Sequence, residues 1–183
     1  MPATTPAATP AATPAANPMV GGVAMDPMKT IVENASAAPN LTTLVKAVTA
    51  AGLVPTLSGP GPFTVFAPND PAFARLPADT VAQLMKPDEK DRLVKVLTNH
   101  VVPGVIDIAA LKAKVTAGNG TAMLTTVEGE PIKVTMSGTG IVTLTDVHGN
   151  IAYVGTADVR QSNGVVHVIN GVLLPTLNAA AAK

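Results

Sequence analysis

One stretch of this chain, residues 62–73, contains all three of its phenylalanines. The rest of the sequence adds a single tyrosine and no tryptophan, so the rings of this stretch are the main large anchors available to a core. From Phe63 to Ala67 the rings alternate with threonine and valine, as in a pleated strand, and Pro68 then removes the next donor of the ladder. The stretch therefore predicts a buried strand that ends at Pro68.

The same stretch continues into a predicted helix start. Asp70 precedes Pro71, so its backbone favours the extended conformation that an N-cap requires, and proline suits the first helical position. We predict a strand, a corner and a short helix with Asp70 as its N-cap. Phe73 on this helix then folds back toward the phenylalanines of the strand.

Size and composition exclude several classes of protein. The 183 residues fit one domain with a tail. Twelve basic and twelve acidic side chains cancel, which disfavours nucleic acid as a partner, and the absence of cysteine excludes disulfides, thiolate metal sites and a cysteine nucleophile. No apolar window approaches the length of a membrane span, and the first residues lack the regions of a signal peptide. We expect no transmembrane segment and no signal peptide in this chain.

The sequence divides into three expected regions. Residues 1–25 are a Pro/Ala/Thr-rich flexible tail or stalk, because proline recurs at every fourth position from residue 2 to residue 18. A plain spacer is the favoured interpretation, and a stalk with glycosylated threonines is the alternative. Residues 26–176 form the folded domain, and residues 177–183 form a disordered C-terminal tail.

Helical patterns fill the first half of the domain. Asp26 with Pro27 predicts the start of a first helix, and Asn40 predicts the N-cap of a second that ends at Gly52. Short helices follow around residues 81–85 and from residue 88 onward, and Asp107 predicts the cap of one more.

The period of the pattern changes from 3.6 to 2 after Gly118, which predicts a β-meander. The run from Val165 to Leu174 is apolar on both faces, so it predicts a strand buried on both sides, with Gly171 as a bulge. Helices followed by strands indicate the α+β class.

Three segments, 62–73, 97–104 and 163–175, resemble the signature segments of the fasciclin (FAS1) domain family in their order and spacing. The resemblance covers about residues 26 to 176. Within the family, the chain is similar to bacterial single-domain secreted members, including mycobacterial secreted antigens. It implies the FAS1 fold, a β-sandwich-like wedge with helices from the N-terminal half packed around it. The positions that match the structural signature are Phe63, Thr64, Phe66, Asn69, Asp70, Phe73, Asn163, Gly164, His167 and Ile169.

The resemblance also implies candidate binding residues. In animal members integrin contact is assigned to a Tyr-His pair and to an Asp-Ile pair, and the matching positions here are Asn99-His100 and Asp158-Val159. Loss of the tyrosine removes a large amphipathic anchor, so integrin binding is not carried over. We treat Asn99, His100, Asp158 and Val159 as a candidate surface for another partner.

Catalytic and metal motifs are weak or missing. The histidines His100, His148 and His167 stand in no spacing that metal sites use, and no serine lies in a nucleophile elbow. Residues 146–150 resemble a calcium loop only faintly, and a hairpin turn explains them better. His167 is expected to be buried and hydrogen-bonded, and His100 to bond the Asn69-Asp70 corner. We therefore predict no catalytic residue, no metal and no cofactor.

Two binding functions remain open at this point, and an enzyme is a third possibility, for which we expect no signal in a broad hydrolase screen with His100→Ala as the control. The first is a non-enzymatic, secreted, periplasmic or cell-surface protein that mediates adhesion or protein–protein interaction, monomeric, with an unidentified protein or cell-surface component as its partner. The alternative is a periplasmic carrier of a small apolar ligand, which the seven methionines and many small side chains favour. The family interpretation requires Phe66 and Ile169 to lie in the same hydrophobic core.

Overall fold

The computed structural model describes residues 19–59 and 61–175. Most of the predicted stalk, residues 1–18 of 1–25, lies outside the described residues, as does the predicted tail at 177–183. The described part of the predicted stalk is not a flexible tail, because residues 19–20 and 23–24 pair as two short strands and the side chains of Val20 and Met25 are buried.

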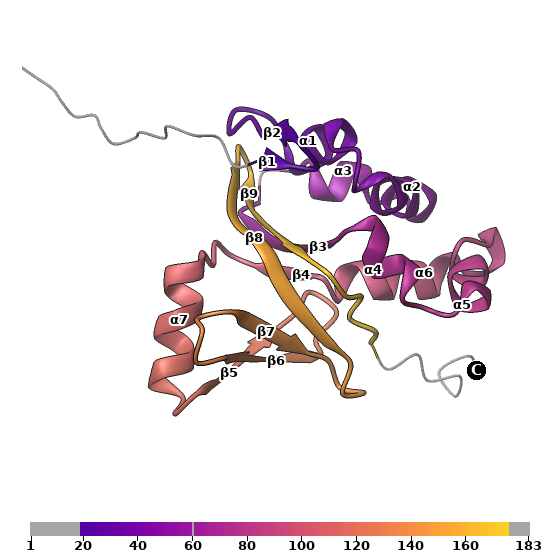
Figure 1. Ribbon diagram of the computed structural model, residues 1–183. Coiled ribbons are helices and arrows are strands. Elements are labelled where there is room, and N and C mark those ends of the chain that lie inside the picture. The colour runs from indigo at the N-terminus through magenta and orange to yellow at the C-terminus, as the bar shows by residue number, and fades with distance from the viewer. Residues whose placement is uncertain (1–18, 60, 176–183) are drawn as a thin grey trace, which may run out of the picture.

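Nine strands and eight helical segments make up the described residues, and Figure 1 shows their arrangement. The strands are β1 (Met19–Val20), β2 (Val23–Ala24), β3 (Phe63–Pro68), β4 (Val101–Pro103), β5 (Thr121–Thr125), β6 (Pro131–Met136), β7 (Val142–Thr145), β8 (Ile151–Gln161) and β9 (Gly164–Ile169). The helices are α1 (Ile31–Ala37), α2 (Thr42–Ala51), α3 (Val54–Leu57), α4 (Asp70–Ala74), α5 (Ala78–Leu84), the 3-10 turn η2 (Pro87–Glu89), α6 (Lys90–Thr98) and α7 (Ile108–Ala117).

Seven strands form one curled sheet in the order β4-β3-β9-β8-β7-β6-β5. β3 and β9 pair in parallel, and the other neighbours are antiparallel. Register shifts between Val154 and Val159 let the long strand β8 pair with β7 at one end and with β9 at the other. The amide of Val127 in the β5–β6 turn donates to the carbonyl of Val101 in β4 at 2.8 Å. The two ends of the strand order therefore meet.

Two buried clusters lie on the two sides of the β3–β9 pair. In Figure 1, α1 to α6 gather along one side of the long β8–β9 pair, and α7 with β5 to β7 lies on the other. The first core joins the helical layer to the sheet, and the second lies between the curled strands and α7. Phe66 and Ile169 both belong to the second core, as the family interpretation requires.

The phenylalanines do not form one group as predicted. Phe73 lies in the first core with Phe63 at its margin, whereas Phe66 points into the second core. Alternation along β3 explains the division, because side chains three positions apart on a strand face opposite sides. The rings anchor two cores instead of one.

The N-cap predicted at Asp70 belongs to its neighbour. The side chain of Asn69 accepts from the amide of Ala72 at 2.9 Å, and α4 begins at Asp70 itself. The Asp70 carboxylate caps α2 instead, because it accepts from the amide of Thr43 at 2.9 Å and the hydroxyl of Thr42 at 2.8 Å. These two bonds lower the pKa of Asp70, although burial acts in the opposite direction and is the largest single influence.

Two other predicted helix starts are also wrong. Asp26 accepts from the amide of Met28 in a turn, and α1 begins later, behind a capping box of Thr30 and Glu33. Asn40 does not cap α2, because Asp70 already occupies that end, and the buried side-chain oxygen of Asn40 has no hydrogen-bond partner among the described residues. The free amides at the start of a helix can bond to any acceptor that reaches them. At the start of α2 that acceptor is Asp70, which is distant in the sequence.

The helix ends that depend on nearby residues agree with the sequence. Gly52 closes α2 in the left-handed conformation with φ of 73°, and Asp107 caps α7 by accepting from the amide of Ala110 at 2.8 Å. The α6 helix begins at Lys90, after the η2 turn, and not at residue 88.

The last strand is shorter than predicted. β9 ends at Ile169, and the amide of Asn170 pairs with the carbonyl of Tyr153 before the chain leaves the sheet. The predicted bulge at Gly171 is absent from β9, since the register shifts lie in β8. Residues after Ile169 remain apolar because they enter the two cores, not because they continue a ladder.

Candidate functional site

The candidate pair Asn99-His100 lies between α6 and β4 and is buried. Asn99 follows the last residue of α6 and His100 precedes β4, so the turn that joins them directs both side chains inward. Only 1% of His100 is exposed, and Asn99 is similarly covered.

His100 has a partner on each ring nitrogen. Nδ1 lies 2.7 Å from the carbonyl oxygen of Val96, and the amide of Leu173 donates to Nε2 at 2.9 Å. Because a carbonyl can only accept, Nδ1 carries the proton and the imidazole is neutral. Burial lowers the pKa of His100 to about 4, against the opposing influence of the Val96 carbonyl and the Asp146 carboxylate. The expected bond to the Asn69-Asp70 corner is not formed, because His100 holds the C-terminal segment instead.

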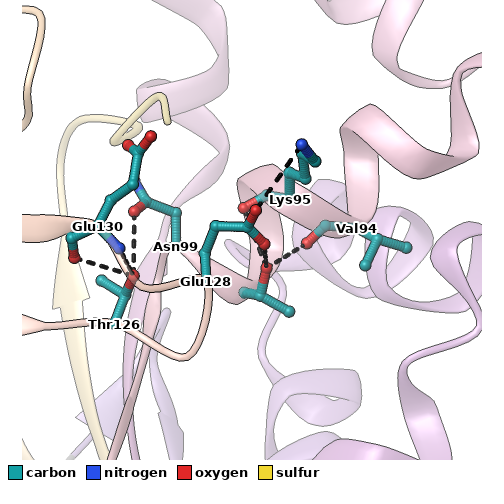
Figure 2. A network of polar contacts seen from close by, with 7 residues as sticks. Val94, Lys95, Asn99, Thr126, Glu128 and Glu130 are labelled. Atoms are coloured by element: carbon teal, nitrogen blue, oxygen red, sulfur yellow. Dashed lines mark hydrogen bonds and ion pairs between the residues drawn. The ribbon is translucent and has the colours of Figure 1, made fainter. Parts of the chain in front are cut away.

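Asn99 ties the same segment to the β5–β6 turn. Its amide nitrogen donates to the carbonyl of Leu173 at 3.4 Å, and its oxygen accepts from the hydroxyl of Thr126 at 3.3 Å. Figure 2 shows this contact beside a second one, in which Glu128 of the same turn reaches Lys95 of α6 at 3.9 Å. Glu128 also accepts from the hydroxyl of Thr98 at 3.0 Å, so Thr126 and Glu128 both bind the turn to the end of α6.

The other candidate pair, Asp158-Val159, lies in the irregular part of β8. Asp158 has φ of 56° and is half-buried, and its carboxylate accepts from the amide of Ile108 at 2.6 Å, at the first residue of α7. Val159 is buried in the first core. Of the four candidate binding residues, Asp158 alone reaches the surface in this conformation.

A small internal cavity is lined by one residue of each candidate pair. His100 and Val159 both line it, among apolar side chains from α1, α2, β3 and β9. Its volume is about 30 Å³, whereas sites for small organic ligands commonly measure roughly 300 to 1,000 Å³. The carrier hypothesis therefore requires a cavity far larger than the present one, and it stays a prediction that native mass spectrometry can test.

The signature asparagine Asn163 joins three segments. Its amide nitrogen donates to the carbonyls of Leu57 at 2.5 Å and Gly59 at 3.0 Å, and its oxygen accepts from the amide of Ile31 at 3.2 Å. The β8–β9 turn is thus bonded to α1 and to the end of α3, which fixes the helical layer on the sheet.

The signature residues Thr64 and His167 hold the chain between β4 and α7. The Thr64 hydroxyl donates to the carbonyl of Gly104 at 2.6 Å, and His167 Nε2 lies 2.7 Å from the carbonyl of Ile106. The amide of Asp158 donates to Nδ1 of His167 at 3.2 Å, so this imidazole is also neutral. Burial lowers its pKa, and the expectation of a buried, hydrogen-bonded His167 is confirmed.

The comparisons with known proteins decide the family. The fasciclin domain model matches residues 39–175. This chain belongs to the fasciclin family. The β-sandwich-like α+β fold and the resemblance of the three segments are therefore confirmed.

Relatives of this fasciclin domain come from several groups of organisms. Protein sll1483 of Synechocystis sp. is 46% identical over 160 residues, which cover 87% of this chain and 81% of that protein. The cell surface glycolipoprotein MPB83 of Mycobacterium bovis is 35% identical over 161 residues, which cover 85% of this chain and 64% of that protein.

A solved structure shares the fold. It is a FAS1 domain pair from the insect cell adhesion molecule Fasciclin I, with a TM-score of 0.70 and 21% identity. The match covers 81% of this chain and 51% of the other, so this fasciclin domain spans about half of the pair.

The described residues contain neither a cluster of metal-ligating side chains nor a helix that could span a membrane. Within residues 19–59 and 61–175, His, Asp and Glu side chains nowhere gather in a group of three that could hold a metal ion. The helices of the same residues are too short or too polar to cross a membrane.

Asp146 makes a long-range contact that the sequence did not predict. Its carboxylate accepts from the amides of His148 at 2.8 Å and Asn150 at 2.9 Å, which makes the predicted hairpin turn. It also accepts from the amide of Leu174 at 2.8 Å. The turn contacts follow from an aspartate placed before glycine and asparagine, but no local signal points to a residue 28 positions away.

We expect the substitution His100→Ala to lower the free energy of unfolding by about 1–3 kcal/mol. The reason is that the buried amide of Leu173 loses its acceptor and the carbonyl of Val96 loses its donor. Urea unfolding of the variant and the wild type measures the loss. The control is His148→Ala on an exposed turn, which loses a single bond from Nε2 to the carbonyl of Pro175, so a smaller loss of at most about 1 kcal/mol is expected. Equal stability of His100→Ala and wild type contradicts the prediction.

Proposed function

We propose that this fasciclin-domain protein is a non-enzymatic, secreted, periplasmic or cell-surface module for adhesion or protein–protein interaction. Two similar proteins support this, since one is a cell surface glycolipoprotein and the other a cell adhesion molecule. The observation that carries the proposal is the outer face of strands β5 to β8.

The strand registers align two rows of side chains on that face. One row runs from Met123 through Lys133 and Thr145 to Ile151. The alternate positions of the same strands, such as Val134 and Leu144, lie in the second core. The residues of the first row therefore point away from the core, toward solvent.

The second row brings an aromatic ring onto the same face. It runs from Thr121 through Thr135 and Thr143 to Tyr153. The exposed fractions of Met123, Ile151 and Tyr153 are 59%, 50% and 43%. Interface cores are enriched in methionine and aromatic residues and depleted of charge, and in these two rows Lys133 is the single charged side chain. The outer face thus has the composition of a protein-binding surface.

The experiment compares binding to the surface of the native cells by wild type and by the double variant Ile151→Thr, Tyr153→Thr. Threonine keeps the strand preference while it removes the apolar area. We expect at least a roughly tenfold loss of binding with unchanged thermal melting. The control is Met28→Thr. This substitution removes an apolar side chain that is 83% exposed but does not belong to the sheet.

Binding that persists in the folded double variant contradicts the role of this face. Fractionation of the native cells tests the location separately. Recovery of the protein from the cytosol alone contradicts the proposed secretion or surface display.

A further inference from the structure

The segment Val172–Pro175 is held by side chains and not by a strand ladder. β9 ends at Ile169, and the next backbone groups find partners on two distant elements. His100 and Asn99, after α6, bond the amide and the carbonyl of Leu173. The turn between β7 and β8 supplies the other two contacts: Asp146 accepts from the amide of Leu174 at 2.8 Å, and His148 Nε2 lies 3.1 Å from the carbonyl of Pro175.

The apolar side chains of this segment close both cores. Val172 belongs to the first core, and Leu173 is fully buried in the second. The segment therefore lies as a strap across the place where the helical layer and the curled strands meet. We call residues 172–175 the strap.

One of the four contacts, at Nε2 of His100, depends on a ring nitrogen that can no longer accept a hydrogen bond once it is protonated. Nε2 of His100 and the carboxylate of Asp146 both accept from strap amides, whereas Asn99 and His148 bond strap carbonyls. Protonation of His100 places an N–H on Nε2, where it faces the N–H of Leu173. Two donors then oppose each other, and the bond is lost.

The groups around His100 set the direction of the effect. From the β7–β8 turn, Asp146 is the charged group that acts on the ring, and from α6 the Val96 carbonyl holds Nδ1. The strap itself brings only valine, leucine and proline, and Lys95 of α6 pairs with Glu128. Burial lowers the pKa of His100 to about 4 with the strap in place, against 6.5 for a solvated imidazole, so His100 takes up a proton more readily once release of the strap exposes it to water. The hydrogen bond from the Leu173 amide to His100 is therefore fully formed above pH 6.5, and it is progressively lost as the pH falls toward 4.

We propose that residues 172–175 are an acid-released strap, which leaves its site on Asn99, His100, Asp146 and His148 while the seven-stranded sheet remains folded. Release uncovers the apolar site of Leu173 and frees the chain that follows β9. This device does not depend on the proposed adhesive function.

The test is amide hydrogen exchange measured by NMR on the full chain between pH 7 and pH 4, with each rate corrected for its intrinsic pH dependence. We expect protection of the Leu173 amide to fall by up to roughly 100-fold by pH 4, the limit reached when release exposes His100 fully and returns its pKa to 6.5. The amides of Val134 and Leu144, in β6 and β7, should keep their protection.

Two variants make the test specific. His100→Gln offers an acceptor that does not titrate, so Leu173 protection should become independent of pH. His148→Gln keeps a donor for Pro175, and its pH response should match that of the wild type. Should His100→Gln fail to fold, the wild-type titration alone decides. Loss of protection by Leu173, Val134 and Leu144 together, or an unchanged Leu173 at pH 4, overturns the proposal.

Discussion

The substitution Gly164→Ala is expected to unfold most of the protein at room temperature. Gly164 opens β9 and lies opposite Phe63 in the parallel pair with β3. A Cβ atom at this position would lie 1.9 Å from the carbonyl oxygen of Phe63, far inside van der Waals contact. The obstacle is backbone and not a flexible side chain, so only a separation of the two strands can relieve it.

That separation affects the centre of the fold. β9 lies between β3 and β8, and the amide of Phe63 donates to the carbonyl of Asn163 at 3.1 Å beside the same glycine. We expect a loss of at least about 4 kcal/mol, which approaches the whole stability of many domains. Urea unfolding followed by circular dichroism measures it.

The matched control is Gly138→Ala. A Cβ atom at Gly138 would meet no atom within 4 Å, so a change within about 0.5 kcal/mol is expected. A Gly164→Ala variant as stable as Gly138→Ala would show that the β3–β9 pair tolerates the added methyl group.

The helix caps show which parts of the fold are determined locally. Asp107 and Gly52 were predicted correctly, because each bonds within its own helix end. Asp70 was misassigned, because its carboxylate has acceptor sites for a helix start 27 residues away as well as for its own. The sequence alone does not show whether the Asp70 carboxylate will lie nearer to the amides of its own helix or to those of α2 in the folded chain.

The length of β9 shows a second limit. A strand buried on both faces and a segment that enters two cores have the same apolar composition, so the run from Val165 to Leu174 could not be divided from sequence. The division follows from partners, since Asn170 bonds Tyr153 and Leu173 bonds His100. Those contacts exist only once β4, β8 and β9 are assembled.

The candidate site was found by resemblance and not by residue chemistry. Asn99 and His100 are present where the family pattern places them, but their burial and their contact with Leu173 follow from the tertiary fold. The outer face of β5 to β8 could be predicted in part, because the period of 2 after Gly118 indicates strands whose side chains alternate between two faces. Its two aligned rows depend on the registers of four strands, which no single segment encodes.

The second large effect is expected for Phe66→Ala. Phe66 is fully buried in the second core, and its ring stacks on His167 with centroids 5.5 Å apart and an interplanar angle of 26°. Few other rings can fill the space, since the chain has three phenylalanines and one tyrosine. We expect the free energy of unfolding to fall by about 3–5 kcal/mol, from lost burial and from the cavity that remains.

His167 provides a second readout of the same substitution. Burial is the largest cause of its lowered pKa, and removal of the Phe66 ring admits water to one face of the imidazole. The pKa of His167 should therefore rise toward 6.5 in Phe66→Ala, as measured by NMR titration of the ring protons. Phe66→Leu is the control, because it keeps most of the apolar volume and should lose less stability. A Phe66→Ala variant with wild-type stability and an unchanged His167 pKa would mean that the ring does not seal the second core around the imidazole.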